Sequence, residues 1–103
     1  MNISGEWHGF LEEIEGEHRN FEMIIWFEQD PDIDEVGCHM EVVLEPEVVE
    51  GRPCGGKFTG GEIRIVDEKD QTYWGVLEGE RLVGETAWGC FDCEPWGVFE
   101  LWR

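Results

Sequence analysis

Alanine and basic side chains are both scarce in this chain, and each scarcity argues against a class of protein. Alanine, the residue that most favours helices, occurs once, at Ala87, whereas glycine occurs 14 times. Glycine disfavours a helix by about 1 kcal/mol per position relative to alanine. The chain also lacks an apolar run that approaches the ~18 residues of a membrane-spanning helix. The composition therefore argues against a helical fold and against a helical membrane protein.

Only 7 residues are basic, against 25 acidic residues, and the formal net charge is −18. The imbalance is concentrated in residues 1–50, which hold 15 acidic residues and a single base, Arg19. A field of this sign repels nucleic acid and anionic membranes, and it attracts basic proteins or cations. We therefore expect a basic protein partner and no direct contact with nucleic acid or membrane. A surface that is acidic for solubility alone, or for life at high salt, is the alternative.

The length of the chain predicts the number of domains, and its first residues predict the cellular location of the protein. A chain of 103 residues with 41% hydrophobic content can bury one core but not two, so we expect one domain, residues 1–103. Residues 1–10 lack the basic and apolar stretches of a secretory signal. We expect a cytoplasmic protein, or a mature chain whose signal has been removed.

Alternation of apolar and polar residues is the dominant pattern, and this period is typical of β-strands. Turn residues separate the alternating segments. Residues 45–56 hold two prolines and three glycines, which predict an irregular connection. Short, regular spacing favours an all-β fold, an eight-stranded antiparallel up-and-down (meander) barrel, over a sandwich. The predicted strands are 3–12, 21–28, 36–44, 56–60, 61–68, 71–78, 80–88 and 95–103.

The same alternation assigns side chains to the inside and the outside of the barrel. The inward set predicted to fill it is Ile3, Trp7, Leu11, Phe21, Met23, Ile25, Phe27, Met40, Val42, Leu44, Phe58, Ile63, Ile65, Tyr73, Leu77, Leu82, Trp88, Phe99 and Leu101. The outward apolar set is Phe10, Ile24, Trp26, Trp74, Val76, Val83, Ala87, Trp96, Val98 and Trp102. Because exposed tryptophans are enriched at interfaces, we expect a homo-oligomer or a partner-binding face on the outer wall. Its centre is predicted at Trp26, Trp74, Trp96 and Trp102.

A short repeat recurs three times, as "WHGFLE" (7–12), "WGVLE" (74–78) and "WGVFE" (96–100). If the last glutamate of each repeat faces water, then Gly9, Gly75 and Gly97 face inward. An inward glycine relieves crowding where a small barrel is sharply coiled. The repeat therefore predicts three places where strands cross closely.

Two segments carry a family resemblance. Gly5-Glu6-Trp7 resembles the Gly-x-Trp opening strand of lipocalin-like and avidin-like barrels, the calycin class, and "GETAWGCF" (84–91) is similar to a late strand of such barrels. The resemblance implies a closed eight-stranded meander with the first-strand tryptophan packed across the barrel floor. It also implies a small apolar ligand bound in the barrel mouth.

The four cysteines are Cys38, Cys54, Cys90 and Cys93, and their pattern leaves three interpretations open. They are inert thiols, disulfides, or ligands of a zinc ion. Cys-x-x-Cys is a usual zinc knuckle, and thiolates with imidazole suit tetrahedral zinc. The predicted meander brings one such set to a single barrel end. That zinc set is His18, Cys54, Cys90 and Cys93.

No catalytic motif is evident, and Ser4 is the only serine. We therefore expect a protein that is not an enzyme and that needs no cofactor other than the candidate zinc. The charge favours an interaction or inhibitor protein that docks on a basic partner, one that itself binds nucleic acid, because spaced carboxylates imitate a phosphate array. The alternatives are a calycin-like binder of a small apolar ligand and an ordinary halophile protein. The expected docking carboxylates are Glu12, Glu13, Glu15, Glu17, Glu22, Glu28, Asp30, Asp32, Asp34 and Glu35.

Overall fold

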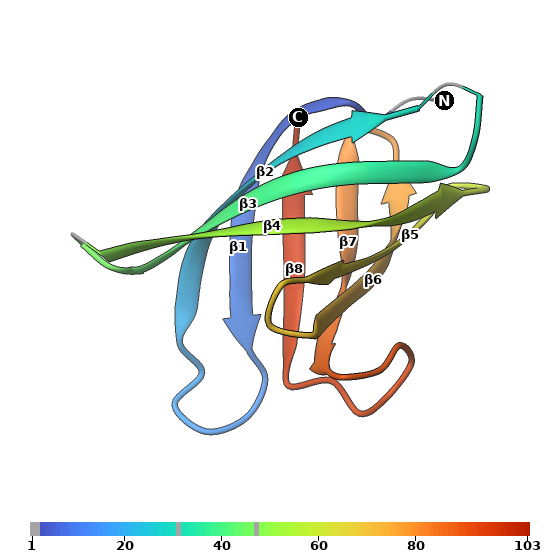
Figure 1. Ribbon diagram of the computed structural model, residues 1–103. Coiled ribbons are helices and arrows are strands. Elements are labelled where there is room, and N and C mark those ends of the chain that lie inside the picture. The colour runs from blue at the N-terminus through green and yellow to red at the C-terminus, as the bar shows by residue number, and fades with distance from the viewer. Residues whose placement is uncertain (1–2, 31, 47) are drawn as a thin grey trace.

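The computed structural model describes residues 3–30, 32–46 and 48–103, and it is all-β. Eight antiparallel strands close into a barrel in chain order, so the predicted meander barrel is confirmed (Figure 1). No helix in these ranges is long and apolar enough to cross a membrane. The strands are β1 (Gly5–Glu13), β2 (Asn20–Gln29), β3 (Glu35–Glu45), β4 (Val48–Thr59), β5 (Glu62–Asp67), β6 (Gln71–Glu78), β7 (Arg81–Trp88) and β8 (Gly97–Trp102).

Closure of the barrel depends on the pairing of the first strand with the last. β1 pairs with β8 from His8↔Trp102 to Glu13↔Gly97, while its other edge pairs with β2. Each strand of the barrel thus has a paired neighbour on both sides over at least part of its length, and closure removes most of the unpaired edges that promote aggregation.

The predicted irregular connection over 45–56 is wrong, because β4 occupies most of it. β4 pairs with β3 from Val48 onward, but with β5 only from Cys54 onward. The segment that contains Pro53 therefore has one neighbouring strand, and there a missing backbone N–H costs no ladder bond. The free half of the β3–β4 hairpin projects sideways from the barrel (Figure 1).

The core sits inside the barrel and agrees in most positions with the alternation. Phe21 and Leu77 are only partly buried. Two predicted core residues are wrong: Leu44 is 39% exposed on the projecting hairpin, and Trp88 is 58% exposed at the end of β7. Ala87, predicted outside, is buried. The core comprises Ile3, Trp7, Leu11, Met23, Ile25, Phe27, Val36, Met40, Val42, Phe58, Ile63, Ile65, Tyr73, Leu82, Phe99 and Leu101.

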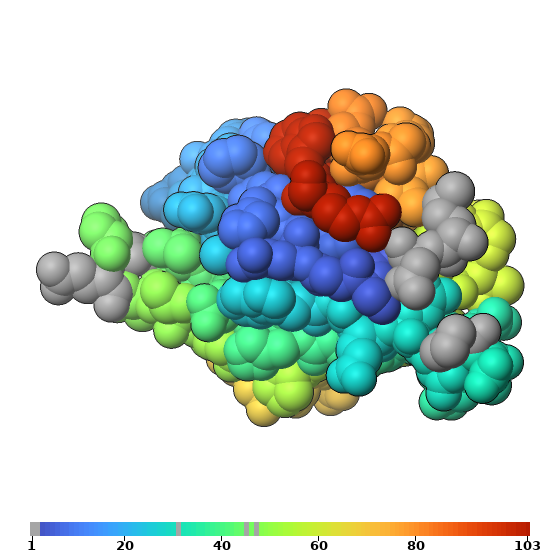
Figure 2. Space-filling model, turned by 90° about the horizontal axis from the view of Figure 1, so that it is seen from above, coloured from blue at the N-terminus to red at the C-terminus, as the bar shows by residue number. Residues whose placement is uncertain are grey.

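One end of the barrel is closed by the first and last residues of the described chain. Trp7 is fully buried, and its indole Nε1 donates a hydrogen bond of 2.9 Å to the carbonyl of Ile3. The guanidinium of Arg103 lies 4.7 Å from the centre of the Trp7 ring. Seen from this end, the C-terminal residues lie against the start of the chain (Figure 2). The tryptophan floor that the calycin resemblance implies is therefore present.

Inward glycines allow neighbouring strands to cross closely. A Cβ atom built on Gly9 would lie 1.8 Å from the carbonyl oxygen of Glu100, and one on Gly75 would lie 2.2 Å from the carbonyl oxygen of Val83. Real Cβ atoms do not approach backbone atoms so closely. At Gly97, the third position, a Cβ atom would lie 3.1 Å from the carbonyl oxygen of Glu12, so the predicted crowding is severe at Gly9 and Gly75 and milder at Gly97.

We predict that Gly9→Ala lowers the free energy of unfolding by about 2 kcal/mol or more, because the added methyl group forces β1 away from β8. The control is Gly37→Ala, where a Cβ atom meets nothing within 4 Å. Urea unfolding measures both variants. Equal stabilities for the two variants would contradict the close crossing.

Candidate functional site

The barrel has a hollow at the end opposite to the one that Trp7 closes. The connection between β1 and β2 and the loop between β7 and β8 both lie at this end (Figure 1). The hollow has a volume of about 350 Å³, within the usual range for small-molecule sites. We call it the mouth, and it is lined by Leu11, Glu13, Arg19, Phe21, Val42, Leu44, Arg52, Gln71, Trp88 and Trp96.

Two stacked tryptophans form one side of the mouth. The rings of Trp88 and Trp96 lie 6.2 Å apart between centres, at an angle of 19°. The backbone of Trp96 is held from two sides, because its N–H donates to the carbonyl of Thr86 and its carbonyl accepts from the N–H of Ile14. The position of Trp96 is therefore fixed, whereas the exposed Trp88 is its outer cover.

The indole N–H of Trp96 is buried and lacks a hydrogen-bond partner, the one such side-chain group within the described residues. An unpaired buried donor costs about 1–3 kcal/mol. Because this nitrogen is enclosed by protein atoms, it is not a contact point for a molecule in the mouth.

The rim of the mouth also carries a charged pair. Arg19 Nε donates to Glu13 Oε1 at 2.6 Å, and this hydrogen bond lowers the pKa of the Glu13 carboxyl group. The guanidinium of Arg19 also lies 5.4 Å from the centre of the Phe21 ring. The only base of the first half of the chain is therefore at the mouth rather than free on the surface.

The floor of the mouth is a buried polar network centred on Arg52. Arg52 Nη1 donates to Asp67 Oδ2 at 3.0 Å and to Gln71 Oε1 at 2.9 Å. Gln71 Nε2 donates to Thr86 Oγ1 at 2.9 Å, and the Tyr73 hydroxyl donates to Asp67 Oδ2 at 3.1 Å. Because these groups satisfy one another, the polar floor is held in a single arrangement.

The charges of the network are balanced at its edge by Glu50. Arg52 Nε donates to Glu50 Oε1 at 2.9 Å, and Lys69 Nζ also bonds to Glu50. These two bonds lower the pKa of Glu50. Burial disfavours the charge of Arg52, but its bonds to Glu50 and Asp67 outweigh burial and raise its pKa. Burial, with the nearby Asp67 carboxylate, raises the pKa of Tyr73, so its hydroxyl stays protonated.

Sequence reasoning missed this network, although one signal of it was available. Asp67 follows Ile63 and Ile65 at intervals of two, so the alternation places a carboxylate on the inward face of β5. A buried carboxylate requires a cationic or hydrogen-bonding partner. Arg52 was not identifiable as that partner while its segment was predicted to be irregular.

The candidate zinc set of His18, Cys54, Cys90 and Cys93 is not brought together. Cys54 forms a disulfide with Cys38, its direct neighbour across β3 and β4, and Cys90 forms one with Cys93 in the loop before β8. Within the described ranges no three His, Cys, Asp or Glu side chains are grouped to hold a metal ion. The predicted placement of Cys54 was wrong because β4 starts at Val48. Cys54 therefore lies within a strand rather than in a connection at the barrel end.

The four tryptophans predicted to centre one outer patch lie in three places. Trp74 and Trp102 line one groove on the outer wall. Trp26 stacks on His39 of β3, with ring centres 5.8 Å apart. The outward prediction for Trp96 is wrong, because it is partly buried against the core and lines the mouth.

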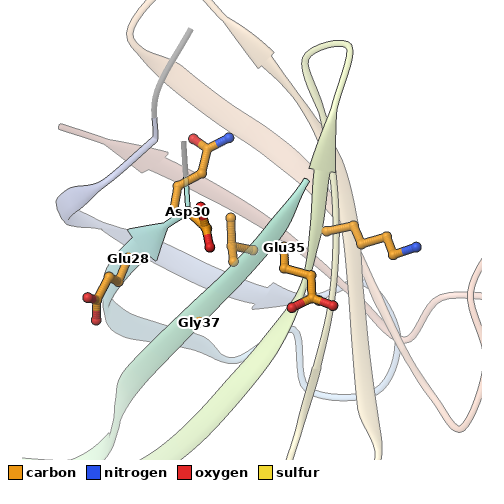
Figure 3. A pocket seen from close by; sticks show the side chains of 8 residues that line it. Glu28, Asp30, Glu35 and Gly37 are labelled. Carbon is orange, nitrogen blue, oxygen red and sulfur yellow. The ribbon is translucent and has the colours of Figure 1, made fainter. Parts of the chain in front are cut away.

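The acidic side chains predicted for docking are spread over both ends of the barrel. Glu13, Glu15 and Glu17 belong to the mouth end, and Glu12 and Glu22 lie on the outer wall between the ends. The remaining five belong to the end that holds the turn between β2 and β3. Three of these, Glu28, Asp30 and Glu35, border a hollow of about 780 Å³, and their side chains spread along it (Figure 3). The five are Glu28, Asp30, Asp32, Asp34 and Glu35.

We predict that Arg52→Met destabilises the protein by about 3–5 kcal/mol, because it leaves Asp67 buried and uncompensated. The double variant Arg52→Met with Asp67→Asn recovers part of this loss. The control is Arg64→Met, which breaks the exposed pair with Asp92 and costs at most about 1 kcal/mol. Denaturant unfolding distinguishes the variants, and equal losses at Arg52 and Arg64 would contradict a buried network.

We predict that Glu50→Gln lowers stability at neutral pH and that this effect disappears in acid. The folded-state pKa of Glu50 is below the ordinary value of 4.5, so the ionised group stabilises the fold above that pH. The contribution is lost as the pH falls through the folded-state pKa. Unfolding curves of both proteins over a range of pH measure the difference, and a difference that keeps its size in acid would refute this role.

Comparison of the chain with protein-family models, with curated proteins and with solved structures finds no match.

Proposed function

We propose that this protein is a non-enzymatic binding protein that takes a small, mainly apolar molecule in the mouth of its barrel. The observation that supports this most is the 350 Å³ hollow, lined by aromatic and aliphatic side chains, at one end of a barrel that is otherwise filled. Apolar concave sites with a few polar groups are the usual form of small-molecule sites. The proposal also agrees with the resemblance to calycin barrels.

Some lining residues of the mouth contribute binding affinity, and others orient the ligand. The Trp88 and Trp96 rings, with Phe21 and Val42, offer apolar surface, whose burial contributes about 25 cal/mol per Å². Arg19 and Glu13 at the rim are the accessible polar groups that orient a ligand. The bonds among Arg52, Asp67 and Gln71 fix the floor before binding, which lowers the entropy cost of complex formation.

We expect Trp88→Ala to weaken binding of the neutral fluorescent probe N-phenyl-1-naphthylamine by about tenfold, because it removes the exposed wall of the mouth. The matched control is Trp26→Ala, which removes a tryptophan from the outer wall. Titration of probe fluorescence measures both affinities. The absence of saturable binding by the wild-type protein, or equal losses in both variants, would reject the proposal.

A second candidate function is docking of the acidic surface on a basic protein, including one that normally binds nucleic acid. The observation that favours it is the acidic end described above, where Asp32, Asp34 and Glu35 are all exposed. Their charges are available to a cationic partner, and such an interaction weakens as salt rises.

For this docking we predict that the triple variant Asp32→Asn, Asp34→Asn and Glu35→Gln binds tetralysine about tenfold more weakly at low salt. The control removes three exposed acids of the second half, with Glu62→Gln, Glu68→Gln and Glu80→Gln. Both variants lose the same number of negative charges. A lower affinity of the first variant alone therefore indicates an acidic surface at this end rather than an effect of net charge. Calorimetric titration at two salt concentrations provides the comparison, and equal affinities would reject a docking surface at this end.

A further inference from the structure

The outer wall carries a groove that is separate from the mouth. It crosses β1, β8, β7 and β6 and has a volume of about 630 Å³. Its floor is partly bare backbone, because Gly75 and Gly84 lie opposite each other in neighbouring strands. We call it the outer groove. Apart from Gly75 and Gly84, its lining residues are Phe10, Glu12, Asn20, Trp74, Val76, Val83, Glu85, Val98, Phe99, Glu100 and Trp102.

The outer groove exposes large apolar side chains. Phe10 is 50% exposed and Trp102 43% exposed, and Val76 adds to the same surface. Apolar surface gathered in this way, rather than scattered singly, marks interaction sites. The groove therefore offers enough apolar surface for a partner to bury.

Carboxylates alternate with the apolar residues across the strands. In one row Glu100 lies between Phe10 and Val83. In the next row Val98 lies between Glu12 and Glu85. Each carboxylate is thus next to an apolar neighbour on the adjacent strand.

The charge of the lining is entirely negative. Arg81, beside the groove, donates to Glu100 Oε1 at 2.9 Å and neutralises that carboxylate. Glu12 and Glu85 are exposed and take part in no ion pair within the described part of the chain. Two carboxylates therefore remain available to cations of a partner.

We propose that the outer groove binds a basic segment of a partner protein, in which lysine or arginine and apolar side chains alternate along one face. The alternating lining is complementary to that pattern, because cations reach Glu12 and Glu85 while apolar side chains cover Phe10 and Trp102. A second copy of the chain is a poor occupant, since two chains of net charge −18 repel and would bring the same carboxylates together. The inference rests on the second candidate function and is independent of the mouth ligand.

The test uses an octapeptide in which pairs of lysines alternate with pairs of leucines, so that each face of the extended peptide carries both kinds. It is compared with tetralysine, which has the same charge and no apolar side chains. We expect the octapeptide to bind at least about tenfold more tightly than tetralysine. The double variant Glu12→Gln and Glu85→Gln should weaken octapeptide binding about tenfold, and so should Trp102→Ser. The control pair, Glu68→Gln with Glu80→Gln, should change it little. Thermal unfolding of each variant verifies that it is folded.

The results also separate this inference from the function on which it rests. Octapeptide binding that is lost in the acidic-end triple variant, but kept in the groove variants, would overturn the groove proposal and leave acidic docking in place. Equal affinity for the octapeptide and tetralysine would overturn it as well. Sedimentation of the wild-type protein alone gives a further check, because a dimer abolished by Trp102→Ser would assign the groove to a second copy.

Discussion

The pairing of β1 with β8 is the constraint on which the rest of the structure depends. It joins the first strand to the last, so the free energy of closing the barrel is gained only when the whole chain is in register. Closure gives alternate side chains an interior and an exterior, and it requires β1 and β8 to cross closely at Gly9. The pairing of the first strand with the last therefore separates the side chains that form the core from those on the outer surface.

The two ends of the closed barrel bury different kinds of side chain. One end is filled by Trp7, with Arg103 against its ring, and the acidic turn between β2 and β3 lies at the same end. The other end contains a buried ion pair between Arg52 and Asp67, whose mutual hydrogen bonds offset the cost of removing their charges from water. The mouth lies against this network, and Arg52 and Gln71 are among its lining residues.

The acidic character of the chain and its binding surfaces are separate properties. Most carboxylates lie in water on both ends and on the outer wall, where they set a long-range field that attracts cations. Selection of one partner among many cations requires contacts at short range, in which apolar surface lies beside a charge. The outer groove combines Phe10 with Glu12 in this way, whereas the mouth combines stacked tryptophans with a neutralised floor. A basic partner and an apolar ligand would therefore address different faces of one barrel.

Period-two alternation, which is a local property, was enough to predict the barrel, the absence of helices and core residues such as Trp7 and Met23. Composition alone determined the acidic surface. The tertiary structure decided what no local pattern carries: the strand through Pro53, the pairing of Cys38 with Cys54 and the partner of Asp67. Each of these depends on the register of β4 against its neighbours. Register is the sum of many contacts between distant residues, so it is settled only when the whole barrel closes.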